Sequence, residues 1–281
     1  MQASFHDKPR GHLVLNDVVK IYDSDGGDIL AVDRCSLDIP AGEICMIVGP
    51  SGCGKTTLLN AVAGFHSITW GTISLDGREL CSSKQPQATP GPDRVVVFQN
   101  GALFPWKTIM DNLTFGPLVQ NTLTKAVAAE RARELLAQAG LNGCEDLYPA
   151  QISSGMRRRA EIARALMNDP SVLLLDEPYR ALDALTRSVM HEALLQMHAL
   201  NPVTILFITH DIEEAVFLGH RVIVMSARPC RPKLVVDVDI PFPRDKRVLT
   251  TSRYRHLVRQ SLDAVHEEAA ISFSAGEREG E

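Results

Sequence analysis

Short, wholly apolar runs alternate with amphipathic segments along most of the chain. The apolar runs predict strands buried on both faces, as in a parallel sheet. Segments with apolar positions three and four residues apart lie between them and predict helices. This alternation favours an α/β fold with a mainly parallel sheet. The predicted strands are 44–48, 94–98, 171–175, 203–209 and 221–226.

The first third of the chain follows a different pattern. Residues 12–22 and 37–39 alternate apolar with polar positions, and 72–77 predicts a short strand that ends in an Asp-Gly turn. Such strands have one buried and one wet face, which favours an N-terminal antiparallel β subdomain. Residues 82–92 are rich in Ser, Gln and Pro and predict a surface loop.

Helical patterns concentrate in the middle of the chain. Residues 124–139 place apolar side chains on one face, and Gly140 can end this helix. A second helix is expected from 153 to 167. We therefore expect an inserted helical lobe at about 100–160. Other helices are predicted over 58–63, 185–200 and 212–218, the last with a capping box formed by Asp211 and Glu214.

Composition narrows the class of protein. The chain has 281 residues, of which 45% are hydrophobic, so it can bury a sizeable core. Its formal net charge of -5 does not suggest nucleic acid as a partner. Six cysteines without a CxxC pair predict reduced thiols. The start of the chain lacks the apolar core of a signal peptide, and no apolar run approaches the roughly 18 residues of a membrane helix.

A glycine-rich stretch stands between a predicted strand and a predicted helix. Its glycines let backbone N–H groups close around phosphate oxygens, and the positive end of the helix points at the same place. Lys55 is expected to reach the β- and γ-phosphates, and the Thr56 hydroxyl to bind Mg²⁺. The alternative is a glycine turn without a ligand. The P-loop pattern GxxxxGK[ST] is carried by Gly49, Pro50, Ser51, Gly52, Cys53, Gly54, Lys55, Thr56 and Thr57.

Two carboxylates follow the predicted strand at 171–175. Asp176 can hold Mg²⁺ through water, and Glu177 can polarise a water that attacks a phosphoanhydride. Adjacent acids after a strand are also common as turn residues. Because a P-loop stands upstream, we interpret the pair as a metal-binding and a catalytic group for hydrolysis of a nucleoside triphosphate.

Three further residues each allow two interpretations. Gln99 follows a predicted strand, where its amide oxygen can join a Mg²⁺ shell or simply face solvent. His210 follows another strand and is either a structural residue or one that faces the nucleotide side of the sheet. The ring of Tyr22 can stack on an adenine base or pack as part of the core.

Two clusters of charge are also open to interpretation. Arg157, Arg158 and Arg159 stand near the start of a predicted helix, where cations are unfavourable without an anionic partner. Either they form a solvated basic face, or this end of the helix awaits a phosphate. Residues 228–259 hold nine Lys or Arg against three Asp or Glu, which predicts a solvated surface or attraction to a membrane surface.

With these segments in order, the chain resembles the ATP-binding subunit of an ABC transporter over roughly residues 12–265. The resemblance implies ATP and Mg²⁺ as cofactors, with Tyr22 stacking on adenine, Gln99 coupling the metal site to the membrane subunits, and His210 acting as the γ-phosphate switch. We expect an ABC ATPase domain over 12–265, with a C-terminal extension at about 228–265. A flexible N-terminus (1–11) precedes this domain and a disordered tail (266–281) follows it. The motifs that carry it are the P-loop at 49–57, Gln99, 152–159 (ISSGMRRR), 173–178 (LLLDEP), 181–183 (ALD) and His210.

The family implies a head-to-tail homodimer in which Ser153 and Gly155 of one copy close on the γ-phosphate held by the P-loop of the other. Ser154 and Asp183 belong to the same nucleotide-binding set. Two positions depart from the family's pattern: Ser154 replaces the first glycine of LSGGxxxR, and Arg180 stands where a serine is usual. A side chain at Ser154 can crowd the phosphate, and Arg180 can change communication between the two sites. We therefore expect hydrolysis to proceed, but slowly.

Some segments resemble one subgroup of the family, the nitrate, sulfonate and taurine importers, which also contains importers of pyrimidine-type vitamin precursors. The implied function is to energise uptake of a small anion from the cytoplasmic face of the cell membrane, as a peripheral subunit. The implied partners are two transmembrane permease subunits and, indirectly, an extracytoplasmic solute-binding protein. The segments concerned are 98–106, 209–218, 226–229 and 241–244.

A turn-rich segment at 101–117 carries Phe104, Pro105 and Trp106. By themselves these residues either pack on the protein's own core or offer an anchor to a partner. The resemblance favours the second interpretation, with a permease subunit docking there. Two other classes remain as alternatives. Soluble ABC ATPases of DNA repair or translation usually carry a second cassette or a long coiled coil, and a non-hydrolysing regulatory protein is suggested only by Ser154 and Arg180.

Overall fold

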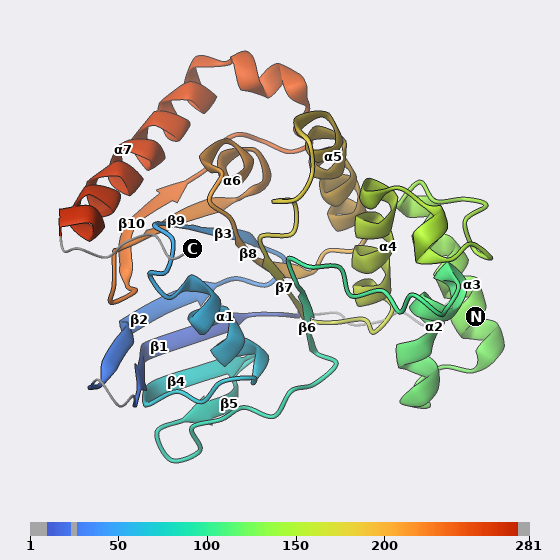
Figure 1. Ribbon diagram of the computed structural model, residues 1–281, viewed down its shortest axis with the longest axis horizontal. Helices are drawn as coiled ribbons and strands as arrows, with labels where there is room; N and C mark the ends of the chain where they lie inside the picture. Colours follow the sequence, from blue (N-terminus) through green and yellow to red (C-terminus); the bar gives the residue numbers. More distant parts are fainter. Residues whose placement is uncertain (1–9, 24–26, 275–281) are drawn as a thin grey trace. The chain divides into compact units, whose positions relative to one another are not determined.

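The computed structural model describes residues 10–23 and 27–274, which form two compact units (Figure 1). Unit 1 comprises Met1–Gly91 and Val203–Glu281, and unit 2 comprises Pro92–Pro202. Residues 1–9 and 275–281, which make up most of the expected flexible N-terminus and part of the expected disordered tail, lie outside the described residues.

Unit 1 contains the expected antiparallel sheet. Its first strand pairs with both β2 and β4; Leu13 and Leu15 are buried in alternation, and Val18 is buried after a shift in register. This is the pattern that period-two alternation predicts for a sheet with one face in the core. The strands, in the order β2-β1-β4-β5, are β1 (Leu13–Tyr22), β2 (Ile29–Ile39), β4 (Trp70–Leu75) and β5 (Arg78–Ser82).

The apolar runs of unit 1 form parallel strands. Strand β3 pairs in parallel with β8 on one side and β9 on the other, and every residue of β3 and β8 is buried. Strand β10 adds to β9 in the antiparallel direction. The ranges are β3 (Ile44–Val48), β8 (Thr204–Ile208), β9 (Arg221–Met225) and β10 (Pro232–Asp237).

Three helices pack in unit 1. Helix α1 (Lys55–Ala63) follows β3 and contacts β2 and β8. Helix α6 (Ile212–Leu218) contacts β3 and β9, and Asp211 caps it by accepting the backbone N–H of Glu214, which is one half of the predicted capping box. The backbone N–H of Asp211 donates to the Thr209 hydroxyl at 3.0 Å. The C-terminal helix α7 (Ser252–Ser274) runs beside α6, β9 and β10 (Figure 1). A 3₁₀ turn at Lys246–Thr250 leads into it.

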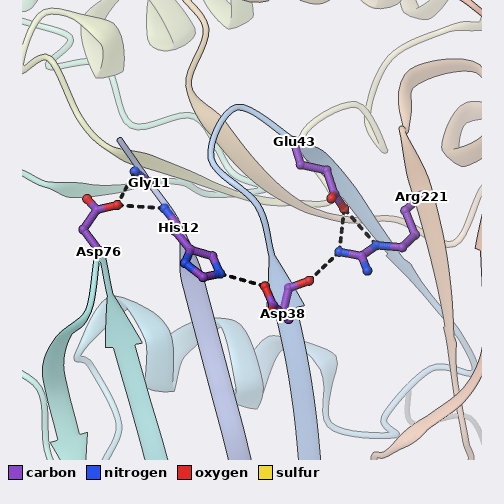
Figure 2. Close-up of polar contacts among 6 residues, drawn as sticks. All are labelled: Gly11, His12, Asp38, Glu43, Asp76 and Arg221. Carbon is purple, nitrogen blue, oxygen red and sulfur yellow. Dashed lines mark hydrogen bonds and ion pairs between the residues drawn. The ribbon is translucent and has the colours of Figure 1, made fainter. Parts of the chain in front are cut away.

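A chain of polar contacts links the antiparallel sheet to the strand before the P-loop (Figure 2). The Asp76 carboxylate accepts the backbone N–H groups of Gly11 and His12, and the His12 ring contacts Asp38 at 2.7 Å. Arg221 donates to the Asp38 carbonyl and, at 2.9 Å, to the Glu43 carboxylate. Burial raises the pKa of Glu43, whereas the Arg221 guanidinium lowers it. Gly11 and His12 are therefore held against the antiparallel sheet.

Unit 2 combines a parallel strand pair with four helices. Strand β6 (Arg94–Val97) pairs with β7 (Val172–Asp176). Helix α4 contacts β6, α2, α3 and α5. The helices are α2 (Ile109–Val119), α3 (Lys125–Gln138), α4 (Ser154–Leu166) and α5 (Ala184–Leu200), with a 3₁₀ turn at Pro149–Gln151.

The predicted α/β fold with antiparallel and mainly parallel sheets is confirmed, but three local predictions were wrong or incomplete. Residues 109–119, expected to be turn-rich, form helix α2 despite Pro117, because burial of Ile109 and Leu113 against α3 and α4 outweighs weak local propensity. Strand β10 was not predicted. Residues 266–274, assigned to a disordered tail, continue α7, whose Glu268 is buried.

In the part of the chain that the structure describes, no helix is both long enough and apolar enough to cross a bilayer.

Candidate functional site: the nucleotide loop and the carboxylates after β7

The predicted P-loop connects β3 to α1 in unit 1. Gly54 is the N-cap of α1 at φ +121°, and a Cβ there would lie 2.5 Å from the Ala31 carbonyl oxygen and 2.8 Å from the Cys230 Cβ. Gly49 at φ +154° would meet the Met225 carbonyl oxygen at 2.9 Å. These glycines are therefore needed both for backbone conformation and for close approach to neighbouring segments. The loop presents backbone at the N-terminus of a helix, where anions bind.

The Lys55 side chain is folded into the loop. Its ammonium donates to the carbonyl oxygens of Gly49 at 2.8 Å and Pro50 at 2.7 Å, and the side chain is buried. It also lies 3.9 Å from the Cys53 sulfur. The neighbouring Thr56 is exposed at the start of α1. Lys55 thus joins two carbonyl groups of the loop and keeps a positive charge at the predicted phosphate position.

Cys53 and Cys230 form a thiol pair at the base of the loop. Both are buried and reduced. A hydrogen bond from Cys230 and the positive charge of Lys55, against the opposing effect of burial, lower the pKa of Cys53 to about 7. The same contact and burial raise the pKa of Cys230. These two side chains join the P-loop to the segment after β9.

The two other predicted nucleotide contacts of unit 1 lie at strand ends. Tyr22 ends β1, and its hydroxyl contacts the ring of His66 at 2.9 Å while the Lys20 ammonium lies 4.7 Å from its ring centroid. His210 is exposed just after β8 and precedes the cap of α6. Their roles in stacking and in sensing the γ-phosphate stay predictions.

The predicted carboxylates end β7 in unit 2. Asp176 is the last residue of the strand, and Glu177 follows in the left-handed region at φ +44°. The Glu177 carboxylate accepts a hydrogen bond from Arg180 at 3.0 Å, with 17% of the Glu177 side chain and 57% of the Arg180 side chain exposed. Arg180 is one of the two positions that depart from the family pattern. It contacts the residue predicted to be the catalytic base.

The three arginines at the start of α4 bind carbonyl oxygens. Arg157 donates to Pro149 and Ile152, and Arg159 donates to Ala139 and Gly140. The guanidinium groups therefore do not form a solvated basic face, because backbone carbonyls within unit 2 serve as their partners. That this helix end awaits a phosphate stays a prediction.

Arg158 has the most partners of the three. It is buried, forms an ion pair with Glu161, and donates to the carbonyl oxygens of Phe98, Gln99 and Pro178. Glu161 in turn accepts the backbone N–H of Ala102. This group joins the start of α4 to the segment around Gln99 and to the residue that follows Glu177.

The predicted signature residues lie at the start of α4. The Ser153 hydroxyl caps the helix by accepting the Met156 N–H at 3.2 Å, and both Ser153 and Ser154 are exposed. Gly155 is buried, and a Cβ there would lie 2.8 Å from Thr186. Asp183 caps α5 by accepting the backbone N–H and the hydroxyl of Thr186, which lowers the pKa of Asp183. This capping role is the one that the structure records for its carboxylate.

Gln99 and the aromatic segment follow β6. Gln99 is exposed two residues after the strand. The ring of Phe104 packs on Trp106 and Phe115, and Trp106 is 71% exposed. The fully buried Asn112 amide accepts the Phe104 N–H and donates to the carbonyl oxygens of Phe104, Lys107 and Thr108. The exposed indole therefore sits on a loop fixed by hydrogen bonds.

Sequence reasoning singled out Arg158 without finding its partners, and it assigned no role to Cys230 or Arg228. Arg228 donates to the carbonyl oxygen of Gly52 in the P-loop at 2.9 Å. The signal for Arg158 was its spacing of three from Glu161 on one helix face. The segments that hold the other two are separated from the P-loop by more than 170 residues, so no local pattern indicated the contacts.

Comparison with known proteins places these features in one family. The family model described as "ABC transporter" matches residues 32–180, a little over half of the chain. A solved structure titled as the dimeric post-hydrolysis state of an ATP-binding cassette bound to ADP and Pi superposes with a TM-score of 0.67 and 27% identity, covering 82% of this chain and all of that chain.

Named relatives of the chain point to the same family. The bicarbonate transport ATP-binding protein CmpD of Synechocystis is 40% identical, covering 92% of this chain and 90% of its own. The aliphatic sulfonates import ATP-binding protein SsuB of Bacillus cereus is 35% identical, covering 89% of this chain and 95% of its own. The chain therefore belongs to the ABC transporter family, as an ATP-binding protein with ATPase activity.

Proposed function

We propose that this protein is the ATP-hydrolysing subunit of an importer that takes up a small anion such as nitrate, an alkanesulfonate or taurine, and that it works at the cytoplasmic face of the membrane as a peripheral subunit. The observation that carries the proposal is the closed P-loop around Lys55, in a chain whose relatives include named bicarbonate and sulfonate transport proteins. An importer of a pyrimidine-type vitamin precursor is the alternative.

In unit 1, the P-loop would bind the triphosphate. The backbone N–H groups at the start of α1 would face the phosphates, and the Lys55 ammonium would donate to β- and γ-phosphate oxygens. Hydrogen bonds from an ammonium to phosphate oxygens are charge-assisted, which favours binding. Tyr22 would stack on the adenine base, and His210 would contact the γ-phosphate.

In unit 2, the residues after β7 would carry the chemistry. Glu177 would polarise the attacking water as a general base. The donor set of Thr56, Gln99 and Asp176 consists of hydroxyl, amide and carboxylate oxygens, which are the ligands that Mg²⁺ prefers. When bound, Mg²⁺ would neutralise charge on the β- and γ-phosphates.

We also propose that two copies act as a head-to-tail dimer. The start of α4 supports this, because Ser153 and Ser154 are exposed at a capped helix N-terminus whose nearby arginines already hold carbonyl oxygens. Such an end attracts an anion through its backbone N–H groups. The γ-phosphate held by the partner copy would be that anion, with Gly155 and Asp183 in the same interface.

Arg180→Ser is expected to raise kcat for ATP hydrolysis by about 3- to 10-fold. The Arg180 guanidinium holds the Glu177 carboxylate, so freeing that carboxylate removes the competitor for the attacking water, with an energy on the scale of one hydrogen bond. Phosphate release measured against ATP concentration checks this. Arg133→Ser, at an exposed position of α3 in unit 2, serves as the control. An unchanged kcat in Arg180→Ser would show that the ion pair does not limit hydrolysis.

Growth tests the transport function. A strain that lacks this chain should lose growth on one solute class from a panel of nitrate, alkanesulfonates, taurine and vitamin precursors offered as sole sources, and the intact gene should restore it. Loss of growth on a vitamin precursor alone would favour the alternative importer. Undiminished growth on the whole panel would contradict uptake of any of these solutes.

Trp106→Ala is expected to reduce solute uptake by at least about tenfold, without changing the affinity for ATP. The exposed indole on the loop fixed by Asn112 would anchor a permease subunit, and a buried Trp at an interface typically contributes about 2 kcal/mol or more. Uptake and ATP titration are measured in parallel. Trp70→Ala removes another exposed indole from unit 1 and is the control. Normal uptake with Trp106→Ala would refute docking at this surface.

A further inference from the structure

The turn after β9 lies against the P-loop. Residues 226–231 form this turn, which we name the β9 turn. Within it, the Ser226 hydroxyl donates to the Pro229 carbonyl oxygen at 2.7 Å, and the backbone N–H of Ser226 donates to the Arg231 carbonyl oxygen at 2.8 Å. These contacts fix the shape of the turn. They also fix where Arg228 and Cys230 project.

The β9 turn approaches the P-loop through Arg228 and Cys230. Arg228 donates to the Gly52 carbonyl oxygen at 2.9 Å, and the Cys230 Cβ would lie 2.8 Å from a Cβ added to Gly54. The thiols of Cys230 and Cys53 interact, which raises the pKa of Cys230 and lowers that of Cys53. The backbone of Cys230 pairs with β2, donating to the Ala31 carbonyl oxygen at 2.9 Å. The turn therefore packs beneath the phosphate-binding backbone and holds one of its carbonyl groups.

A carboxylate from the C-terminal helix fixes the other side of the turn. Glu268 of α7 is buried, with 4% of the residue exposed, and its carboxylate accepts the Ala227 N–H at 2.9 Å. Lys233 of β10 pairs with the same carboxylate at 3.0 Å. A buried carboxylate that holds a backbone N–H and a lysine is costly to remove, because both partners lose their acceptor. Glu268 thus ties α7 to the residue adjacent to Arg228.

We propose that Arg228 and Glu268 are positioning residues for the nucleotide, which set the affinity for ATP by holding the P-loop through the β9 turn. Glu268 holds the turn, the turn places Arg228, and Arg228 holds the Gly52 carbonyl so that the adjacent backbone N–H groups face the phosphates. The C-terminal helix is through this link part of the nucleotide-binding apparatus. The inference rests on the proposed ATP site in the P-loop.

The proposal predicts a change in ATP affinity rather than in the chemical step. Arg228→Ala should raise the KM and the Kd for ATP by about 3- to 10-fold, the scale of one hydrogen bond, with kcat within twofold of the wild type. Arg228→Lys keeps a donor and should recover part of the loss. Glu268→Ala should raise the KM similarly, whereas Glu268→Gln keeps an acceptor for Ala227 and should have a smaller effect.

The double variant tests whether the two residues act through one link. If Glu268 acts by placing Arg228, the Arg228→Ala/Glu268→Ala variant should bind ATP no more weakly than the weaker single variant. Independent effects would multiply instead. Arg247→Ala is the matched control, since it removes an exposed arginine of unit 1 that pairs with Asp245 away from the turn.

The measurements are ATP titration and phosphate release on the purified full-length chain with Mg²⁺, with thermal unfolding to verify that each variant is folded. A KM in Arg228→Ala equal to that of the wild type would overturn the positioning role even if Glu268→Ala fails to fold. Multiplying effects in the double variant would overturn the link through the turn. A wild-type chain that neither binds nor hydrolyses ATP would instead refute the proposed function itself.

Discussion

Glu177→Gln is expected to reduce kcat for ATP hydrolysis by about 100- to 10,000-fold, the range that a general base contributes, with the affinity for ATP nearly unchanged. The amide has the shape of the carboxylate but cannot accept the proton of the attacking water. Glu177 follows directly on β7 with a left-handed backbone, so its position is set by the strand end and persists in the variant. Phosphate release and ATP titration measure the two effects separately.

The same substitution should trap the ATP-bound dimer, which size-exclusion chromatography with ATP and Mg²⁺ would detect. Folding should be preserved, because the ion pair that is lost has an arginine side chain that is 57% exposed, and such pairs contribute about 0–1 kcal/mol. Glu130→Gln, at an exposed position of α3, is the matched control. Full activity in Glu177→Gln would remove this residue from the mechanism, and a monomer in the presence of ATP would argue against the proposed dimer.

Lys55→Ala is expected to weaken ATP binding by about 10- to 100-fold. A hydrogen bond to a charged group contributes about 1.5–3 kcal/mol, and about 1.4 kcal/mol corresponds to a tenfold change in affinity. The loop also loses the ammonium that holds the carbonyl oxygens of Gly49 and Pro50. The variant therefore loses both a proposed phosphate ligand and a contact that shapes the loop.

Calorimetric titration with ATP and Mg²⁺ measures this loss, and Lys246→Ala controls for removing an exposed lysine from the same unit. Lys55→Arg should bind ATP more weakly than the wild type, because the planar guanidinium does not fit between carbonyl groups placed for an ammonium. If Lys55→Ala bound ATP as tightly as the wild type, the nucleotide would have to bind elsewhere.

The parts of the site that could be predicted from the sequence are those carried by local patterns. The P-loop and the acids after β7 each combine a buried strand with a fixed spacing of glycines or charges, so sequence alone placed Lys55 at the start of a helix and Glu177 at the end of a strand. The cap at Asp211 behaved in the same way, since its carboxylate holds the backbone N–H of Glu214 three residues on.

The contacts that could not be predicted join residues distant in the chain. Arg228 reaches Gly52 across 176 residues, and Arg158 reaches Phe98 across 60. The sequence also does not distinguish an arginine that faces solvent from one whose guanidinium donates to carbonyl oxygens. Helix α2 was missed for a related reason, because Asn112 and Pro117 disfavour a helix locally and packing within unit 2 decides the outcome.

The buried amide of Asn112 has a consequence for assembly. An unconstrained loop that becomes ordered on binding loses conformational entropy, at about 0.5–1.5 kcal/mol for each immobilised side chain. Asn112 removes that cost in advance by fixing the backbone from Phe104 to Thr108. A membrane subunit that binds Trp106 would meet a preorganised surface. Association should then be fast and reversible, because neither protein has to refold when the two bind or dissociate.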